Sequence, residues 1–288
     1  MTTLPTISPR RRRADRAARW LLAGGTGLAL LPLVLVIYYL LIKGLGAWSV
    51  DFFTTDPTGK FFGDPGGIKS AILGTIEIVA LATLMAVPVG IGVALYLVEY
   101  GKQGRFASVV RYFVDVMTGV PSIVFGLFIY IVFVLAGTGG SSFAGWKGSF
   151  ALALLMLPIV TRAGEVVLLL VPDSLREAAL ALGAPRWRVV LRIVLPTALP
   201  GLVTGTLLSI ARAAGETAPL LFTIFIAKAA TSDLSGPMNS LPTQIFSDVG
   251  QPRDVLVTRA WGAALTLVVM ILALTTIARL ISRRSRLA

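Results

Sequence analysis

Long stretches of this chain contain no charged residue, and they limit what it can fold into more than any other feature does. A helix needs about 20 apolar residues to cross the hydrocarbon core of a bilayer. Uncharged runs of this order occupy residues 21–42, 78–98, 116–146, 193–211 and 260–278. A sixth segment, 148–171, is apolar except for Arg162 and Glu165. The sequence therefore predicts an all-α integral membrane protein with six transmembrane helices.

We expect one membrane domain preceded by an additional helix. Residues 1–19 form a basic tail, 20–43 the first transmembrane helix, and 70–281 a five-helix core. The core spans are expected at 70–98, 112–136, 148–171, 197–227 and 259–281. A short helix is expected in the outer loop 228–258, and the sequence suggests no role for 44–68.

The net charge of +12 is unevenly distributed along the chain. With the N-terminus inside, most Lys and Arg fall in cytoplasmic segments, beginning with the run Arg10–Arg13. The outer segments hold fewer: Lys43, Lys60, Lys69, Lys147, Lys228, Arg253 and Arg259. This is the positive-inside pattern of membrane proteins, and it places both termini in the cytoplasm. The basic residues are thus an orientation signal beside membrane lipid, and no nucleic-acid partner is expected.

The composition also limits the chemistry of the chain. It contains no Cys and no His, which removes disulfides, most zinc sites and the commonest general base. The stretch GDPGGIKS, residues 63–70, has Ile68 where a phosphate-binding loop needs Gly before its Lys. We therefore expect no catalytic residue, no metal site and no bound cofactor in this chain.

Two Arg/Glu pairs stand inside apolar segments. Arg212 and Glu216, in ARAAGETAP, are four residues apart and are predicted to share a helix face; Arg162 and Glu165 are three apart. A charge at the centre of a transmembrane helix costs roughly 2.5–3.5 kcal/mol on insertion scales. Guanidinium groups suit oxyanions because their planar fork of donors matches two oxygens at once. We predict that both pairs line a solute path; a purely structural pairing is the alternative.

Two features beside these pairs bear on the same path. Small residues recur every fourth position at Gly201, Gly205, Ser209 and Ala213, which predicts close helix packing beside the ridge of Arg212. Pro121-Ser122 is expected either to break the third span, leaving a helix N-terminus at Ser122 to face an anion, or to act as a packing kink.

The inner loop 172–196 is patterned like a pair of helices. Ser174 and Glu177 fit a capping box, Gly183 fits a left-handed helix stop, and Pro185 can open the next helix. The loop is either an amphipathic hairpin on the membrane surface or a preformed knob that docks into a cytoplasmic partner.

At this loop the sequence resembles a known family. Glu177-Ala178-Ala179, Gly183 and Ile193-x-Leu195-Pro196 match the EAA loop of ATP-binding-cassette importer permeases. The stretches GVPSIVFGLF (119–128) and ARAAGETAPLLFT (211–223) are similar to phosphate importer permeases, and the second resembles the PstA-type subunit.

The resemblance implies the function and the partners. Glu177, Ala178, Ala179 and Gly183 would couple the chain to two PstB-like ATPase subunits, which use the ATP, so the chain itself is not an enzyme. A PstC-like homologous permease and an external PstS-like phosphate-binding protein would complete the importer in the bacterial plasma (inner) membrane. The alternatives are a PstC-type subunit or a permease for another oxyanion. A gradient-driven transporter or channel fits less well, because it has no ATPase to which an EAA loop could dock. A membrane hydrolase fits less well, because the chain has no His, no Cys and no Gly-x-Ser-x-Gly motif.

Overall fold

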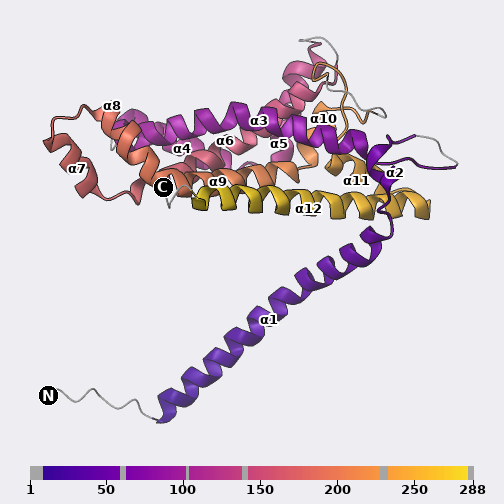
Figure 1. The fold of residues 1–288 in the computed structure, drawn as a ribbon, viewed down its shortest axis with the longest axis horizontal. Helices are drawn as coiled ribbons and strands as arrows, with labels where there is room; N and C mark the ends of the chain where they lie inside the picture. The colour runs from indigo at the N-terminus through magenta and orange to yellow at the C-terminus, as the bar shows by residue number, and fades with distance from the viewer. Residues whose placement is uncertain (1–8, 59–62, 102–103, 138–141, 228–232, 285–288) are drawn as a thin grey trace.

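The computed structural model describes residues 9–58, 63–101, 104–137, 142–227 and 233–284, with side chains from residue 10 to 280. Within these ranges the chain is helical, apart from turns and one isolated antiparallel bridge between Pro57 and Gly66 (Figure 1). Lowercase η denotes a π-helical segment. The elements are α1 (Pro9–Leu45), α2 (Val50–Thr54), α3 (Lys69–Leu95), η1 (Tyr96–Gly101), α4 (Arg105–Gly119), α5 (Ser122–Ile129), η2 (Tyr130–Leu135), α6 (Gly145–Leu169), α7 (Asp173–Ala181), α8 (Arg186–Val189), η3 (Val190–Val194), α9 (Leu195–Ala214), α10 (Ala218–Thr223), α11 (Leu241–Val249) and α12 (Asp254–Arg284).

The helices confirm the membrane class. Five of them are long and apolar enough to cross a bilayer: Arg10–Leu45, Lys69–Gly101, Gly145–Leu169, Arg186–Ala214 and Asp254–Leu280. The third expected span, 112–136, is not one helix. It is divided into Arg105–Gly119 and Ser122–Leu135, which meet at an angle of 100°. Hydropathy alone could not show this bend, because residues 116–146 are uncharged on both sides of it.

Helix α6 lies at the centre of the bundle and contacts α3, α4, α5, α9 and α10. Small residues let the backbones approach closely, as the sequence ridge predicts. A Cβ added at Gly205 would lie 2.6 Å from Ala163 Cβ, and one at Gly201 would lie 2.6 Å from Val167 Cγ1. Ser209 and Ala213, farther along the same ridge, are fully buried. The ridge of α9 is therefore its packing face against the bundle.

The fifth span differs from the expected 197–227 at both ends. The helical path begins at Arg186, continues through η3 and α9, and ends at Ala214. Gly215 then closes a turn before the short helix α10. The short helix expected in the outer loop is present as α11, where Ser240 and Thr243 form a capping box.

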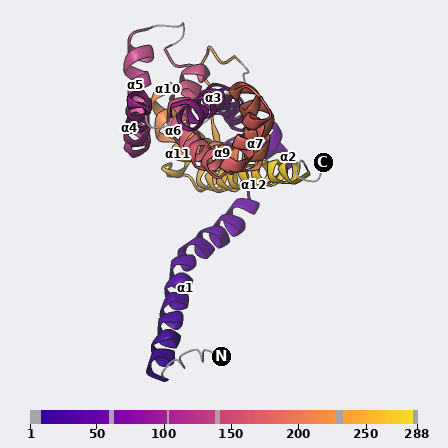
Figure 2. The ribbon, with the colours of Figure 1, turned by 90° about the vertical axis from the view of Figure 1, so that its left-hand side faces the viewer.

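Helix α1 extends away from the bundle (Figures 1 and 2). It is tied to α12 near its C-terminal end, where a Cβ on Gly44 would lie 2.7 Å from Leu265 Cβ. Its apolar side chains are otherwise mostly exposed, as a helix surrounded by lipid or by another membrane subunit requires. The basic residues 10–19 belong to the same helix and are not a separate coil.

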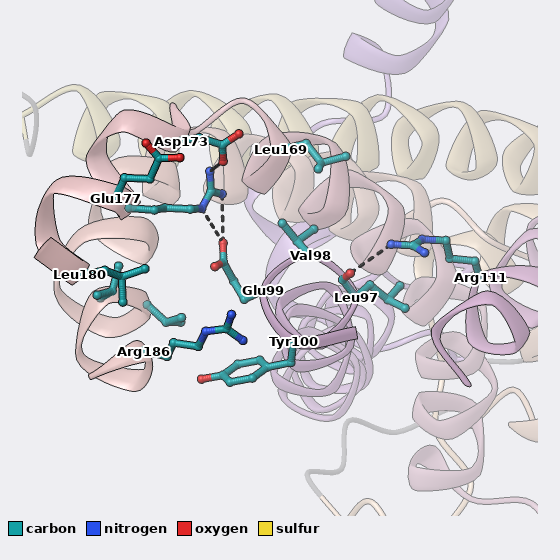
Figure 3. Close-up of a pocket in the computed structure, with 13 residues that line it drawn as sticks. Leu97, Val98, Glu99, Tyr100, Arg111, Leu169, Asp173, Glu177, Leu180 and Arg186 are labelled. Carbon is teal, nitrogen blue, oxygen red and sulfur yellow. Dashed lines mark hydrogen bonds and ion pairs between the residues drawn. The ribbon is translucent and has the colours of Figure 1, made fainter. Parts of the chain in front are cut away.

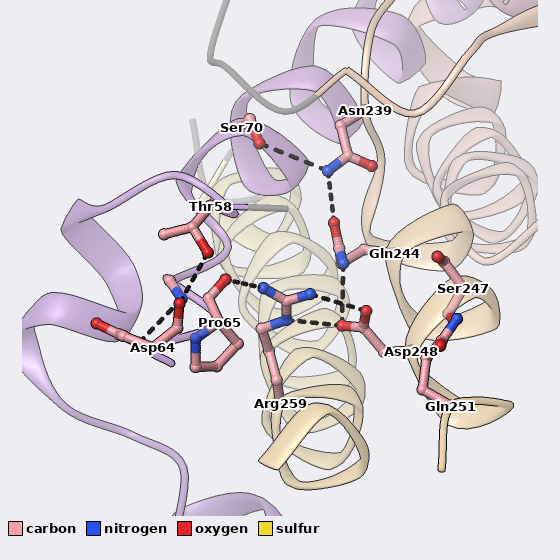
Figure 4. Close-up of polar contacts among 11 residues, drawn as sticks. Thr58, Asp64, Pro65, Ser70, Asn239, Gln244, Ser247, Asp248, Gln251 and Arg259 are labelled. Atoms are coloured by element: carbon pink, nitrogen blue, oxygen red, sulfur yellow. Dashed lines mark hydrogen bonds and ion pairs between the residues drawn. The ribbon is translucent and has the colours of Figure 1, made fainter. Parts of the chain in front are cut away.

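A buried polar network closes the end of the bundle near α2 and α11 (Figure 4). Arg259 of α12 holds both carboxylate oxygens of Asp248, with Nε–Oδ2 and Nη2–Oδ1 distances of 2.8 Å. Arg259 also donates to the carbonyl of Pro65, and Gln244 donates to Asp248 at 2.9 Å. The 44–68 segment, for which the sequence suggests no role, is thus fastened to α12 and α11.

Candidate functional site

The buried pair predicted on α6 belongs to a larger set of four charges. Arg162 Nη1 donates to Glu165 Oε2 at 2.7 Å. The other carboxylate oxygen of Glu165 accepts from Arg111 Nε at 2.6 Å. Arg162 also holds Asp115 Oδ1, through Nε at 2.8 Å and through Nη2. The result is an alternating row, Asp115–Arg162–Glu165–Arg111, which we call the charge ladder.

The sequence identifies only the two α6 members of the charge ladder. Arg111 and Asp115 lie on α4, 54 and 47 residues from their partners, so no local spacing connects them to α6. The available signal is on α4 itself, where the two residues are four apart and share one helix face. Glu165 is buried, with a side-chain exposure of 7%, whereas Asp115 is 53% exposed.

Arg162 opens onto a shallow groove of about 520 Å³ between α6 and α9, whose α9 wall includes Thr204 and Gly205. Arg212 lies two turns along α9 from Thr204, on the same ridge, and its side chain is 61% exposed. Eight residues of α-helix correspond to about 12 Å. The two arginines therefore follow one face of the α6–α9 pair at different depths, with Arg162 but not Arg212 lining this groove.

The pair Arg212–Glu216 is present, but the expected geometry is wrong. Helix α9 ends at Ala214, so Glu216 lies in the turn beyond it and not on a shared helical face. The ion pair spans this turn, with Arg212 Nε 3.6 Å from Glu216 Oε1. The small residues before it favour packing along α9, but Gly215 ends the helix between the two charges, which their four-residue spacing does not indicate.

The broken third span puts Ser122 at the first position of α5, with Pro121 at the N-cap. Of the two alternatives, a break and a packing kink, the structure has the break; the role of Ser122 toward an anion stays a prediction. The break also brings two distant motifs together. A Cβ on Gly126 of GVPSIVFGLF would lie 2.5 Å from the Cα of Pro219 in GETAPLL. The two stretches pack backbone to backbone as α5 against α10.

The loop 172–196 forms a helix, a turn and a second helix at the opposite end of the bundle from α2 and α11 (Figure 1). Gly183 has φ of +80°, as predicted for a left-handed stop. Its N–H donates to Leu180 O at 2.9 Å, and that of Ala184 donates to Ala179 O at 3.2 Å, which is the Schellman pattern. The predicted capping box is wrong, because α7 begins at Asp173 with Pro172 as a cap that makes no side-chain hydrogen bond.

One arginine fastens this loop to the bundle (Figure 3). Arg176 of α7 donates to Glu99 Oε1 of η1 through Nε at 3.0 Å, and its Nη1 donates to Asp173 Oδ1 at 3.0 Å. It also donates to the carbonyls of Val171 and Leu168, at 2.6 and 2.8 Å. The same π-helical segment accepts from Arg111, through Leu97 O at 3.0 Å. Segment η1 therefore contacts both the charge ladder and the loop, a connection that the sequence does not indicate.

Sequence comparison determines the family of the chain. The family model described as "Binding-protein-dependent transport system inner membrane component" matches residues 86–287. "Phosphate transport system permease protein PstA 1" of Mycobacterium tuberculosis (strain ATCC 25618 / H37Rv) is 40% identical, across 98% of this chain and 92% of the relative. The chain belongs to the PstA-type permeases of this transport family. "Phosphate transport system permease protein PstA" of Yersinia pestis is 39% identical, across 96% of this chain and 92% of the relative.

Solved structures share the fold of this PstA-type permease at lower identity. A chain of a bacterial alginate ABC transporter superposes with a TM-score of 0.68 at 16% identity, covering 96% of both chains. A chain of the MetNI methionine ABC transporter gives 0.59 at 21% identity, covering 75% of this chain and 96% of the other. The importer-permease fold expected from the EAA loop is thereby confirmed, and the protein is a multi-pass membrane permease.

The EAA loop of this permease presents side chains of two kinds. Ala179 lies on the buried face of α7, within the cluster that also contains Val189 and Val194. Glu177 and Ala178 are exposed, and Leu182 at the tip of the turn is 89% exposed. A cavity of about 500 Å³ separates α7 from η1, with Glu177 and Arg186 on its wall (Figure 3). The loop therefore projects from the bundle with an apolar tip.

Proposed function

We propose that this chain is the transmembrane permease subunit of an ATP-driven phosphate importer in the bacterial plasma (inner) membrane. The observation that supports this most strongly is the 40% identity to a phosphate transport permease, which extends across 98% of the chain. An external binding protein delivers inorganic phosphate, and a PstC-like permease provides the other half of the path.

The side chains suit such a solute. Arg212 lies in the last turn of α9, and Arg162 lies beside Thr204, about two turns earlier along the same face. Each is accompanied by a carboxylate, Glu216 or Glu165, which orients the guanidinium when the path is empty. A carboxylate also weakens the hold on an anion, and a transport site must release its solute. The N-terminus of α5, at Ser122, also helps to bind the anion.

The loop 172–196 couples the permease to ATP hydrolysis. Glu177 and Ala178 on the outer face of α7 contact one of two PstB-like ATPase subunits, while Ala179 and Gly183 keep the loop in shape. ATP is bound and hydrolysed by those subunits and by no group of this chain. Closure of the ATPases then displaces α7, and Arg176 transmits the displacement to η1 and α6.

The test is uptake of labelled phosphate by cells that lack the gene. Arg212→Ala is expected to reduce uptake at least tenfold at equal expression, with sulfate failing to compete in the wild type. Arg19→Ala is the matched control, because Arg19 also forms an exposed i,i+4 ion pair but lies on α1, remote from the path. Wild-type uptake by Arg212→Ala would refute the proposed path.

A further inference from the structure

Asp115, one member of the charge ladder, accepts hydrogen bonds from the same Arg162 nitrogens that a transported anion would need. Arg162 presents Nε and Nη2 along one edge of its guanidinium, and this fork is the part that binds two oxygens of a phosphate. In the structure both nitrogens donate to a single oxygen, Asp115 Oδ1. The remaining nitrogen, Nη1, donates to Glu165. Asp115 thus takes the place that an oxyanion would take.

The two carboxylates on Arg162 are not equivalent. Glu165 is 7% exposed and is held from its other side by Arg111, so removing it would expose two guanidinium groups to each other. Asp115 is 53% exposed, at the outer end of the ladder. Of the two, Asp115 is the one that an incoming anion can replace without dismantling the buried part of the ladder.

Charge balance supports the same exchange. The ladder contains two guanidinium and two carboxylate groups, so it is neutral when Asp115 is in place. With Asp115 withdrawn, two positive charges face one negative charge, and an oxyanion restores the balance. Asp115 lies on α4, which ends at Gly119 before the 100° bend, so α4 and α5 are separate helices and a shift of α4 need not displace α5.

We propose that Asp115 is an internal counter-anion: it pairs with Arg162 while the path is empty, the transported oxyanion displaces it, and its return ejects the oxyanion. This rests on the proposed function, since it assumes that Arg162 lines the path. Asp115 therefore acts as a positioning and release residue, and it sets how tightly the permease itself holds phosphate.

The proposal is tested by equilibrium binding of ³²P-labelled inorganic phosphate to the complete transporter in nanodiscs, without ATP or binding protein. Asp115→Asn is expected to lower the Kd for phosphate at least tenfold, and Asp115→Glu to retain the wild-type value. Asp173→Asn is the matched control, because it removes another solvent-facing carboxylate, 87% exposed, that pairs with Arg176 away from the path. It is expected to leave the Kd unchanged.

Different results overturn different statements. An unchanged or higher Kd in Asp115→Asn, with binding lost in Arg162→Gln, overturns the counter-anion role and leaves the proposed function intact. Wild-type binding and uptake in Arg162→Gln refute the path at Arg162 itself. Were Asp115 only a structural clamp, Asp115→Asn would weaken binding or leave it as it is.

A second measurement separates charge from folding. The chain has no cysteine, so Asp115→Cys introduces its only thiol, which can be modified in the folded complex if the other subunits are cysteine-free. Carboxymethylation restores a negative charge at position 115, whereas carbamidomethylation adds a neutral group of similar size. The neutral adduct is expected to bind phosphate at least tenfold more tightly than the charged one. Equal Kd values for the two adducts overturn the proposal.

Discussion

At the scale of single residues, the charge ladder depends most on Glu165. Its two carboxylate oxygens are divided between Arg111 and Arg162, and its side chain is 7% exposed. Removing one partner from a buried ion pair typically costs about 3–5 kcal/mol, because the remaining charge stays buried without compensation. Glu165 is therefore the residue that permits two arginines to lie side by side at this depth.

We expect Glu165→Gln to lower the thermal stability of the detergent-solubilised complex clearly, and Asp115→Asn to lower it little. Asp115 is more than half exposed, and exposed ion pairs contribute about 0–1 kcal/mol. The measurement is a thermal unfolding midpoint for both variants and the wild type in the same detergent. Equal shifts for the two variants would show that burial does not distinguish the two carboxylates.

Sequence spacing predicts only two of the four residues of the charge ladder. Arg162 and Glu165 are three residues apart on one helix, which local periodicity can recognise. Asp115 meets Arg162 only because α4 packs on α6, and no spacing within the chain encodes that contact. Sequence motifs predict the structure better where it depends on a local backbone conformation alone, as at Gly183.

At the scale of elements, the turn after α7 illustrates such a local rule. Gly183 has φ of +80°, and a Cβ at this position would meet nothing within 4 Å. The cost of a side chain there is consequently conformational and not steric, about 1–2 kcal/mol for an ordinary L-residue. Asn tolerates this conformation better than other residues do.

Gly183→Val is expected to reduce phosphate uptake and co-purification of the ATPase strongly, Gly183→Ala less, and Gly183→Asn least. The reason is that the Schellman turn sets the angle at which α7 projects. Uptake and ATPase recovery should be measured on the same membranes. An identical effect of Asn and Val would mean that the left-handed conformation is not what the glycine supplies.

The bend in the third span shows what hydropathy cannot predict. Residues 116–146 are uniformly uncharged, so the apolar run continues through Val120 and Pro121 although the helix does not. The reason for the bend lies elsewhere in the chain: α5 packs on α10, and Gly126 provides the space for Pro219. Proline indicates where a break is tolerated, while the packing partner determines the direction after it.

Gly126→Ala is expected to separate α5 from α10, because its Cβ would lie 2.5 Å from the Cα of Pro219, and backbone atoms cannot move aside. The unfolding midpoint and the uptake of phosphate should both fall. Gly119→Ala is the matched control, since a Cβ there meets nothing within 4 Å. A wild-type midpoint for Gly126→Ala would contradict the close approach of the two helices.

At the scale of the whole molecule, the two ends of the bundle differ in accessible charge. The end with α7 and α8 carries Arg186, Arg188 and Arg192, all exposed. At the other end Lys43 and Lys69 are exposed, but Arg259 is buried in its pair with Asp248, and Lys147 is fully buried, donating to Phe133 O at 2.9 Å. The excess of Lys and Arg at the α7–α8 end is consequently stronger on the surface of the folded chain than in the sequence. The positive-inside rule then predicts that α7 and α8 face the cytoplasm.

This orientation can be tested with single thiols, because the native chain has none. Leu182→Cys lies at the exposed tip after α7, and Gln251→Cys lies on an exposed turn after α11 at the opposite end (Figures 1 and 4). A membrane-impermeant maleimide is expected to label Gln251→Cys in intact spheroplasts and Leu182→Cys only after permeabilisation. The reverse pattern would place the EAA loop outside the cell, where no ATPase could reach it, and would overturn both the orientation and the coupling role of that loop.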